Sequence, residues 1–237
     1  MLQRLDKVIA STGKWSRKEV KLLVKQGRVC IDGKLAGAPE DKCDPEQAEI
    51  TVDGEAIGYR RTTWLMMNKP AGVLSATEDG RASTVLDLLP KELQKLELFP
   101  VGRLDKDTEG LLFLTNDGVL AHKLLSPKYH VDKVYYARTA GCLTEEDCVA
   151  FRKGMQLGNG LQCLPAELEI LRASPEESEA YVTLREGKFH QVKRMLAARG
   201  NPVQYLKRIK MGNLTLDSAL ESGEFRFLSD AEVESLQ

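Results

Sequence analysis

Three charged side chains that could carry out chemistry lie close together between two apolar segments of this sequence. Arg103, Asp105 and Asp107 follow the apolar run Phe99–Val101 and precede a second one, Leu111–Thr115. Charges placed between two buried strands are costly unless they are paired or used. A carboxylate there could act as a nucleophile at a sugar carbon or as a base. The alternative is a structural ion pair within the loop, between Arg103 and one of the two aspartates.

The stretch GRLDKDTEGLLFLTNDG, from Gly102 to Gly118, resembles the signature motif of the RsuA family of RNA pseudouridine synthases. The resemblance implies that Asp105 is the catalytic aspartate and that Arg103 is the arginine preceding it. Glu109 departs from the small residue of the family pattern, and we expect this departure to affect the fit of the substrate. The implied reaction breaks the bond between ribose and a uracil nitrogen. It then rejoins the base to the ribose through a uracil carbon, without a redox change.

Two further motifs resemble the same family. MMNKPAGVLS contains Lys69 in a strand followed by a KPxG turn, and KVYYA matches a K-x-Y motif. The resemblance implies that Tyr135 packs against the target base, and we expect Lys69 to contact RNA. The structural alternatives are an ordinary Pro-Gly turn and a tyrosine that faces the core.

EGKFHQVKRM matches the third family motif, and its helix is predicted to begin near Phe189. His190, Lys193 and Arg194 then share neighbouring faces of that helix. The resemblance implies that Lys193 pairs with the catalytic aspartate, and we expect Arg194 to contact RNA. The alternative is a solvated basic helix, and His190 is assigned no role in proton transfer.

The first 34 residues are strongly basic, with nine lysines and arginines against three acids, and residues 38–55 are acidic. Leu5, Val8 and Ile9 have the spacing of a helix that Gly13 can close. Ser16 and Glu19 form a capping box for a second helix, which Gly27 ends. Its apolar side is Val20, Leu23 and Val24, and its basic side is Arg17, Lys18, Lys21 and Lys25.

Two hairpins are predicted after these helices, around Asp32-Gly33 and Asp53-Gly54. The segment RLDKVIASTG, followed by SRKEVKLLVKQGRVCIDGK and ITVDGE, resembles the alpha-L RNA-binding domain. The one-sided basic helix favours phosphate binding over a merely solvated surface. We therefore expect Arg4 and the basic side of the second helix to contact RNA.

The predicted organisation is an α+β protein with an alpha-L RNA-binding domain at 1–58, a linker at 59–63 and a catalytic domain at 64–237. Strand-like runs (WLMMNK, GLLFLT, VYYARTA, EAYVTL) alternate with helical stretches after Gly118, near Glu145 and from Phe189 to Arg199. The resemblance implies a central, mostly antiparallel sheet with flanking helices and an active-site cleft.

Composition and motif searches exclude several classes of protein and kinds of site. The formal net charge is −1, so the basic N-terminal region is a local feature. The five cysteines show no regular framework, and the three histidines lack zinc-ligand spacing. The sequence contains neither GxGxxG nor GxxxxGK[ST]. We expect no cofactor, no metal, no membrane span, no signal peptide, a cytoplasmic location and a monomer.

Together these features indicate an enzyme that isomerises one uridine of rRNA, in the small subunit (16S) by resemblance to the RsuA branch. The substrate would be rRNA or a precursor particle, with Arg103, Arg208 and the basic helix contacting phosphates. A large-subunit (23S) uridine is the first alternative, because sister enzymes share these motifs. The others are a non-catalytic RNA-binding protein of ribosome assembly and a glycoside hydrolase using Asp105 and Asp107.

Overall fold

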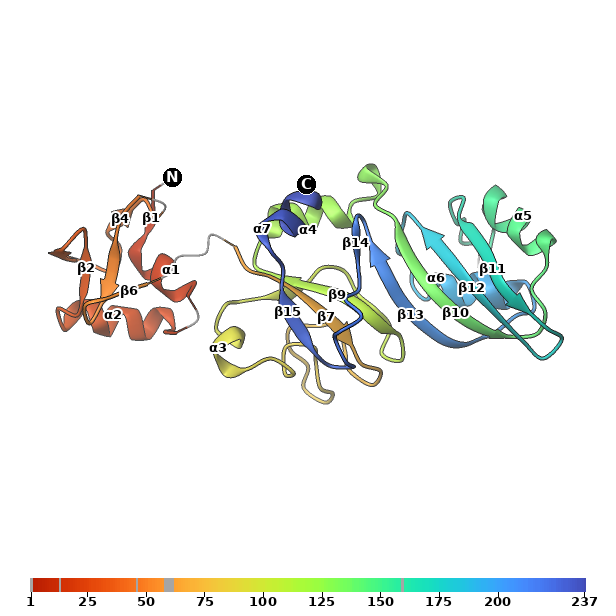
Figure 1. Cartoon of the computed structure of the whole chain (residues 1–237), viewed down its shortest axis with the longest axis horizontal. Helices are drawn as coiled ribbons and strands as arrows, with labels where there is room; N and C mark the ends of the chain where they lie inside the picture. The colour runs from red at the N-terminus through yellow and green to blue at the C-terminus, as the bar shows by residue number, and fades with distance from the viewer. Residues whose placement is uncertain (1, 13, 46, 58–61, 159) are drawn as a thin grey trace. The chain divides into compact units, whose positions relative to one another are not determined.

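The computed structural model describes residues 2–12, 14–45, 47–57, 62–158 and 160–237 (Figure 1). The chain divides into two compact units. The first comprises Met1–Thr63 with Leu86–Phe99, and the second comprises Trp64–Val85 with Pro100–Gln237. Most of the predicted linker, 59–63, falls outside the described residues, so the domain boundaries stay a prediction.

Two helices form one side of the first unit. Helix α1 (Leu5–Ala10) ends before Gly13, which lies outside the described residues. Helix α2 (Arg17–Lys25) begins with the predicted capping box: the Glu19 amide donates to Ser16 Oγ at 3.3 Å, and the Glu19 carboxylate accepts from the Ser16 amide at 2.6 Å. The apolar side of α2 is buried and its basic side is exposed, as predicted.

Short strands complete the first unit. Asp32 and Gly33 both have positive φ, 50° and 75°, in the turn of one hairpin, and Asp53 and Gly54 repeat this at 55° and 80°. Such pairs of positive φ make the tight turns that match the twist of the flanking strands. The strands and the remaining helix of this unit are β1 (Gln3–Arg4), β2 (Val29–Ile31), β3 (Lys34–Leu35), β4 (Lys42–Cys43), β5 (Ile50–Val52), β6 (Glu55–Ala56) and α3 (Lys91–Gln94).

A large sheet organises the second unit, with the order β11-β12-β10-β13-β9-β7-β15. Its pairs are antiparallel except β13 with β9, so the predicted, mostly antiparallel sheet is confirmed. Its strands are β7 (Trp64–Lys69), β9 (Glu109–Thr115), β10 (Lys133–Ala140), β11 (Glu167–Ala173), β12 (Glu177–Leu184), β13 (Val203–Met211) and β15 (Phe225–Phe227), with β14 (Leu214–Thr215) on β13 and β8 (Phe99–Pro100) on β9.

Helices pack on one face of this sheet, and the other face stays partly open. Along β10 and β12 the residues alternate between buried and half-buried, which shows that only one face is covered. Helix α6 lies behind β10 and β12 in the view of Figure 1. The helices are α4 (Gly118–Leu125), α5 (Glu145–Lys153), α6 (Gln191–Ala198), α7 (Asp230–Ser235) and the 3₁₀ turn η1 (Pro127–Tyr129).

Strands β7 and β9 are buried almost throughout, because both of their faces are covered. Their continuous apolar sequences, WLMMNK and GLLFLT, are typical of such strands. The charged loop identified in the sequence leads directly into β9, so this rigid pair supports it. Within the described residues, no helix has the length and apolarity needed to cross a membrane.

Candidate active site

Asp105 and Asp107 meet the side chain of Lys193 in the loop before β9. Lys193 Nζ lies 3.1 Å from Asp105 Oδ2 and 2.5 Å from Asp107 Oδ1. The Asp105 and Lys193 side chains are 24% and 21% exposed, whereas the Asp107 side chain is 75% exposed. The lysine therefore sits between an inner and an outer carboxylate, and an ion pair is worth more where solvent is reduced.

His190 also borders the inner carboxylate. Its Nε2 lies 3.5 Å from Asp105 Oδ1, and its ring stacks on Phe189 with centroids 3.8 Å apart. His190 has φ of 50° and precedes the first residue of α6, so the chain turns sharply there into the helix. Helical spacing then places Lys193 beside His190, both facing Asp105.

Lys69 binds backbone carbonyl groups of the loop that carries Asp105. Its ammonium is fully buried and donates to the carbonyl oxygens of Pro70, Lys106 and Thr108, at 2.9, 3.3 and 2.9 Å. The Gly72 amide donates to the Lys106 carbonyl at 2.7 Å, and the Thr108 amide donates to the Asp105 carbonyl at 3.1 Å. The KPxG turn and the loop of Asp105 are thus joined through one cation, which makes Lys69 a positioning residue.

The electrostatics follow from burial and pairing. Burial lowers the pKa of Lys69 to about 8, although Asp107, Glu109 and Asp105 oppose the shift. The hydrogen bond from Lys193 holds the pKa of Asp107 below its ordinary value. Burial alone would lower the pKa of Lys193, but its bonds to Asp107 and Asp105 outweigh burial and raise it. Lys193 is therefore charged at neutral pH.

The sheet behind the loop places Tyr135 among buried cations. Tyr135 on β10 is in register with Arg208 on β13, and Arg208 is in register with Gly110 on β9. Gly110 has φ of +100°, and a Cβ there would lie 2.3 Å from the Arg208 carbonyl oxygen, so only glycine fits. Burial lowers the pKa of the neighbouring Lys133 to about 8, and the charge of Arg208 adds to this.

A family model for RNA pseudouridylate synthases matches residues 63–198, which include every residue of this site except Arg208. This chain belongs to the RNA pseudouridine synthase family. A model for the S4 domain matches residues 3–50. The resemblance noted in the sequence is thereby confirmed, and the α+β fold comprises an S4 domain and a pseudouridine synthase domain.

Several relatives are similar to this chain over nearly its whole length. The chain is 51% identical to an uncharacterised RNA pseudouridine synthase of Bacillus subtilis, over 98% of both chains. It is 39% identical to ribosomal small subunit pseudouridine synthase A of Vibrio cholerae, over 98% of this chain and 99% of that one. A crystal structure of a pseudouridylate synthase superimposes with a TM-score of 0.70 at 35% identity, covering 99% of each chain.

Of the predicted catalytic residues of this pseudouridine synthase, the structure brings Asp105 and Lys193 into contact. Tyr135 lies on the covered face of the sheet and is 9% exposed, and no hydrogen bond or ion pair between described residues joins it to Asp105. Arg103 is exposed and makes no ion pair or hydrogen bond with the described part of the chain. The alternative of a loop ion pair with Arg103 is therefore wrong within those residues.

Two side chains that were predicted to contact RNA are buried in the structure. Lys69 is fully buried with all three ammonium hydrogens directed at carbonyl oxygens. Arg208 is 2% exposed, and its Nε donates to the Leu111 carbonyl at 2.8 Å. Both cations hold backbone around the site and present no charge to a phosphate. Arg194 follows Lys193 on α6 and is half-buried.

In the S4 domain, the predicted basic surface has two parts. Arg4 and Arg17 reach the buried Asp6 carboxylate, at 2.9 and 3.4 Å, and Arg4 also pairs with Glu40. Desolvation would raise the pKa of Asp6, but these arginines lower it. Lys18, Lys21 and Lys25 are exposed and form no ion pair with described residues. These three lysines form the exposed basic side of α2.

Sequence reasoning did not include His190 or Asp107 among the predicted catalytic residues. The sequence places His190 and Lys193 three residues apart, which is the only signal that could have linked His190 to the site. Glu109 Oε2 accepts a hydrogen bond from the Tyr205 hydroxyl at 2.8 Å, and burial with this bond raises the pKa of Tyr205 to about 12. The Glu109 carboxylate is therefore engaged by Tyr205 on β13.

Proposed function

We propose that this pseudouridine synthase isomerises one uridine of small-subunit rRNA, with Asp105 as the catalytic carboxylate. The observation that carries the proposal is the contact between the partly buried Asp105 and Lys193. The contact places a positive charge directly against a carboxylate, and carboxylates act as nucleophiles or bases in glycosidic chemistry. The small-subunit target follows the names of relatives that match over nearly the full chain.

The reaction breaks the bond from ribose C1′ to uracil N1 and forms a bond from C1′ to C5. The proton on C5 is lost, and N1 gains one, so the product is an isomer. The base has to leave its stack first, which costs a few kcal/mol. Tyr135 keeps 9% of its surface exposed on β10, and Phe189 is 73% exposed next to His190. We assign base stacking to these two rings, where it offsets part of that cost.

The cations have different roles in this proposal. Lys193 pairs with Asp105 at 3.1 Å, while Lys69 and Arg208 fix the surrounding backbone. Arg103 is exposed beside the loop and would hold a phosphate or fill the place of the flipped base. The exposed lysines of α2 would contact the RNA backbone. An rRNA or a precursor particle as substrate, a monomeric state and a cytoplasmic location remain predictions of the same proposal.

Mapping pseudouridine in the rRNA of cells that lack this gene tests the proposal. We expect one small-subunit site to lose its modification and to regain it with wild-type protein but not with Asp105→Asn. Loss at a large-subunit uridine would keep the chemistry and correct the target. If Asp105→Asn restored the modification, the assignment of Asp105 would be wrong. No change at any uridine would favour the non-catalytic RNA-binding alternative.

A further inference from the structure

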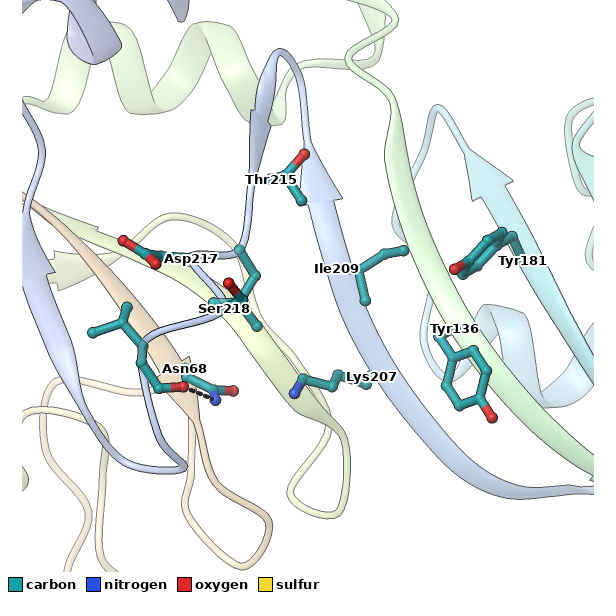
Figure 2. A pocket seen from close by; sticks show the side chains of 10 residues that line it. Asn68, Tyr136, Tyr181, Lys207, Ile209, Thr215, Asp217 and Ser218 are labelled. Atoms are coloured by element: carbon teal, nitrogen blue, oxygen red, sulfur yellow. Dashed lines mark hydrogen bonds between the residues drawn. The ribbon is translucent and has the colours of Figure 1, made fainter.

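A pocket of about 300 Å³ opens on the sheet face opposite to the one that α6 covers (Figure 2). Tyr136 and Lys207 line it, and they alternate along their strands with the buried Tyr135 and Arg208. Since alternate residues of a strand face opposite sides, the pocket is separate from the site of Asp105. Its volume is at the lower end of the range for small-molecule sites.

Aromatic rings form one wall of the pocket. Tyr136 and Tyr181 pack edge to face, with ring centroids 6.2 Å apart and an interplanar angle of 65°. The Tyr136 hydroxyl donates to Glu179 Oε2 at 2.8 Å, which fixes the orientation of that ring. Both tyrosines are half-buried, so part of each ring is open to the pocket. Ile209 and Leu216 add apolar surface beside them.

Two polar groups with spare hydrogen-bonding capacity face these rings. Asn68 is 6% exposed, and its only side-chain hydrogen bond to a described residue is the donation from Nδ2 to the Leu220 carbonyl at 2.9 Å. Its Oδ1 therefore accepts from no described residue. Lys207 pairs with no described carboxylate, because its strand neighbour Glu109 is bonded to Tyr205. Figure 2 shows the Lys207 side chain extending toward Asn68.

We propose that this pocket binds an unpaired nucleobase. The base would lie against Tyr136 and Tyr181, since every base offers a π face to an aromatic ring. An N–H group of the base would donate to Asn68 Oδ1, and an adjacent carbonyl or ring nitrogen would accept from Lys207 Nζ. A donor next to an acceptor is found on the pairing edge of nucleobases. This site does not depend on which uridine the enzyme modifies.

The base could belong to a single-stranded RNA segment or to a free nucleotide, and a titration distinguishes these sources. Purified full-length protein would be titrated with each of the four nucleoside 5′-monophosphates and with a short, mixed-sequence single-stranded oligoribonucleotide. NMR of labelled protein would locate the response. We expect saturable shifts at Tyr136, Tyr181 and Lys207, and about tenfold weaker binding in Tyr181→Leu and in Lys207→Gln.

Matched controls are Tyr129→Leu, which removes an exposed tyrosine elsewhere, and Lys210→Gln, which removes the same charge from the same strand. Tighter binding of the oligomer than of every mononucleotide assigns the pocket to an RNA strand, and equal binding assigns it to a free nucleotide. The proposal is overturned if neither ligand shifts the pocket residues. It is also overturned if Tyr181→Leu and Lys207→Gln, folded by circular dichroism, bind as tightly as the controls. Uridine isomerisation, measured separately on the same samples, keeps this test distinct from that of Asp105.

Discussion

Cations of helix α2 and cations of the sheet near Asp105 have opposite surroundings. Lys18, Lys21 and Lys25 project from α2 into solvent without ion pairs to described residues. Lys69 and Arg208 are buried and bonded to backbone carbonyl oxygens. An exposed lysine contributes through long-range attraction and counterion release, which depend on salt. A buried, bonded cation contributes by fixing the geometry of the backbone around it. Neutralising the exposed lysines should therefore reduce RNA affinity, whereas neutralising the buried cations should reduce kcat.

Among the cation variants, the largest effect is expected from Lys69→Met, which preserves volume but releases the loop that carries Asp105. We expect kcat to fall about a hundredfold, since small misplacements of a catalytic group have effects of that order, with RNA affinity unchanged. Steady-state isomerisation and equilibrium binding would separate the two quantities. Lys106→Met is the matched control, because Lys69 binds the carbonyl of Lys106 and not its side chain. A loss of RNA affinity with unchanged kcat would show that Lys69 does contact RNA.

Neutralising α2 should give the opposite result. In Lys18→Gln/Lys21→Gln/Lys25→Gln we expect RNA binding to weaken about tenfold and kcat to stay unchanged. The slope of log affinity against log salt should become shallower by about 2, at roughly 0.7–0.9 per lost phosphate contact. Affinity measured over a range of salt concentrations tests this. A double variant at the exposed Lys128 and Lys153 should leave the slope as it is, and an equal change there would remove any special role for α2.

A smaller effect is expected from Asp107→Asn. Its carboxylate shares Lys193 with Asp105 but is 75% exposed, and exposed ion pairs contribute only about 0–1 kcal/mol. We therefore expect kcat to change less than about fivefold, against a loss of about a thousandfold or more in Asp105→Asn. Single-turnover rates for both variants provide the comparison. Similar losses in the two would mean that the outer carboxylate takes part in the reaction.

The last effect is expected in the pH dependence of stability and not in activity. The pKa of Lys69 is about 8 in the folded protein and about 10.4 in an unfolded chain. Between these values the unfolded chain binds more protons, so the contribution of Lys69 to the free energy of unfolding rises with pH. It is fully present above about 10.4 and is lost as the pH falls through 8. Denaturant titrations should show the free energy of unfolding of wild type rising relative to that of Lys69→Met as the pH increases across this window. A difference that stays constant with pH would contradict the prediction.

Local elements were predictable from sequence because their signals are local. Ser16 and Glu19 defined the start of α2, and Asp32-Gly33 defined a hairpin, through bonds and dihedral angles within a few residues. Strands β11 and β13 were not predicted. Both carry charged or polar residues on the open face of the sheet, and their pairing depends on β12, β10 and β9, which lie far away in sequence.

The sequence by itself determined the family and the order of the motifs, since both depend on residue identity and spacing. The pairing of Asp105 with Lys193 was implied by the resemblance to that family. Tertiary structure decided which cations meet solvent, because burial depends on what packs over a side chain. It placed Lys69 and Arg208 inside, turned Glu109 toward Tyr205, and brought His190 to within 3.5 Å of Asp105. Spacing along the chain determines the face of one element, whereas only the assembled sheet and helices determine what that face touches.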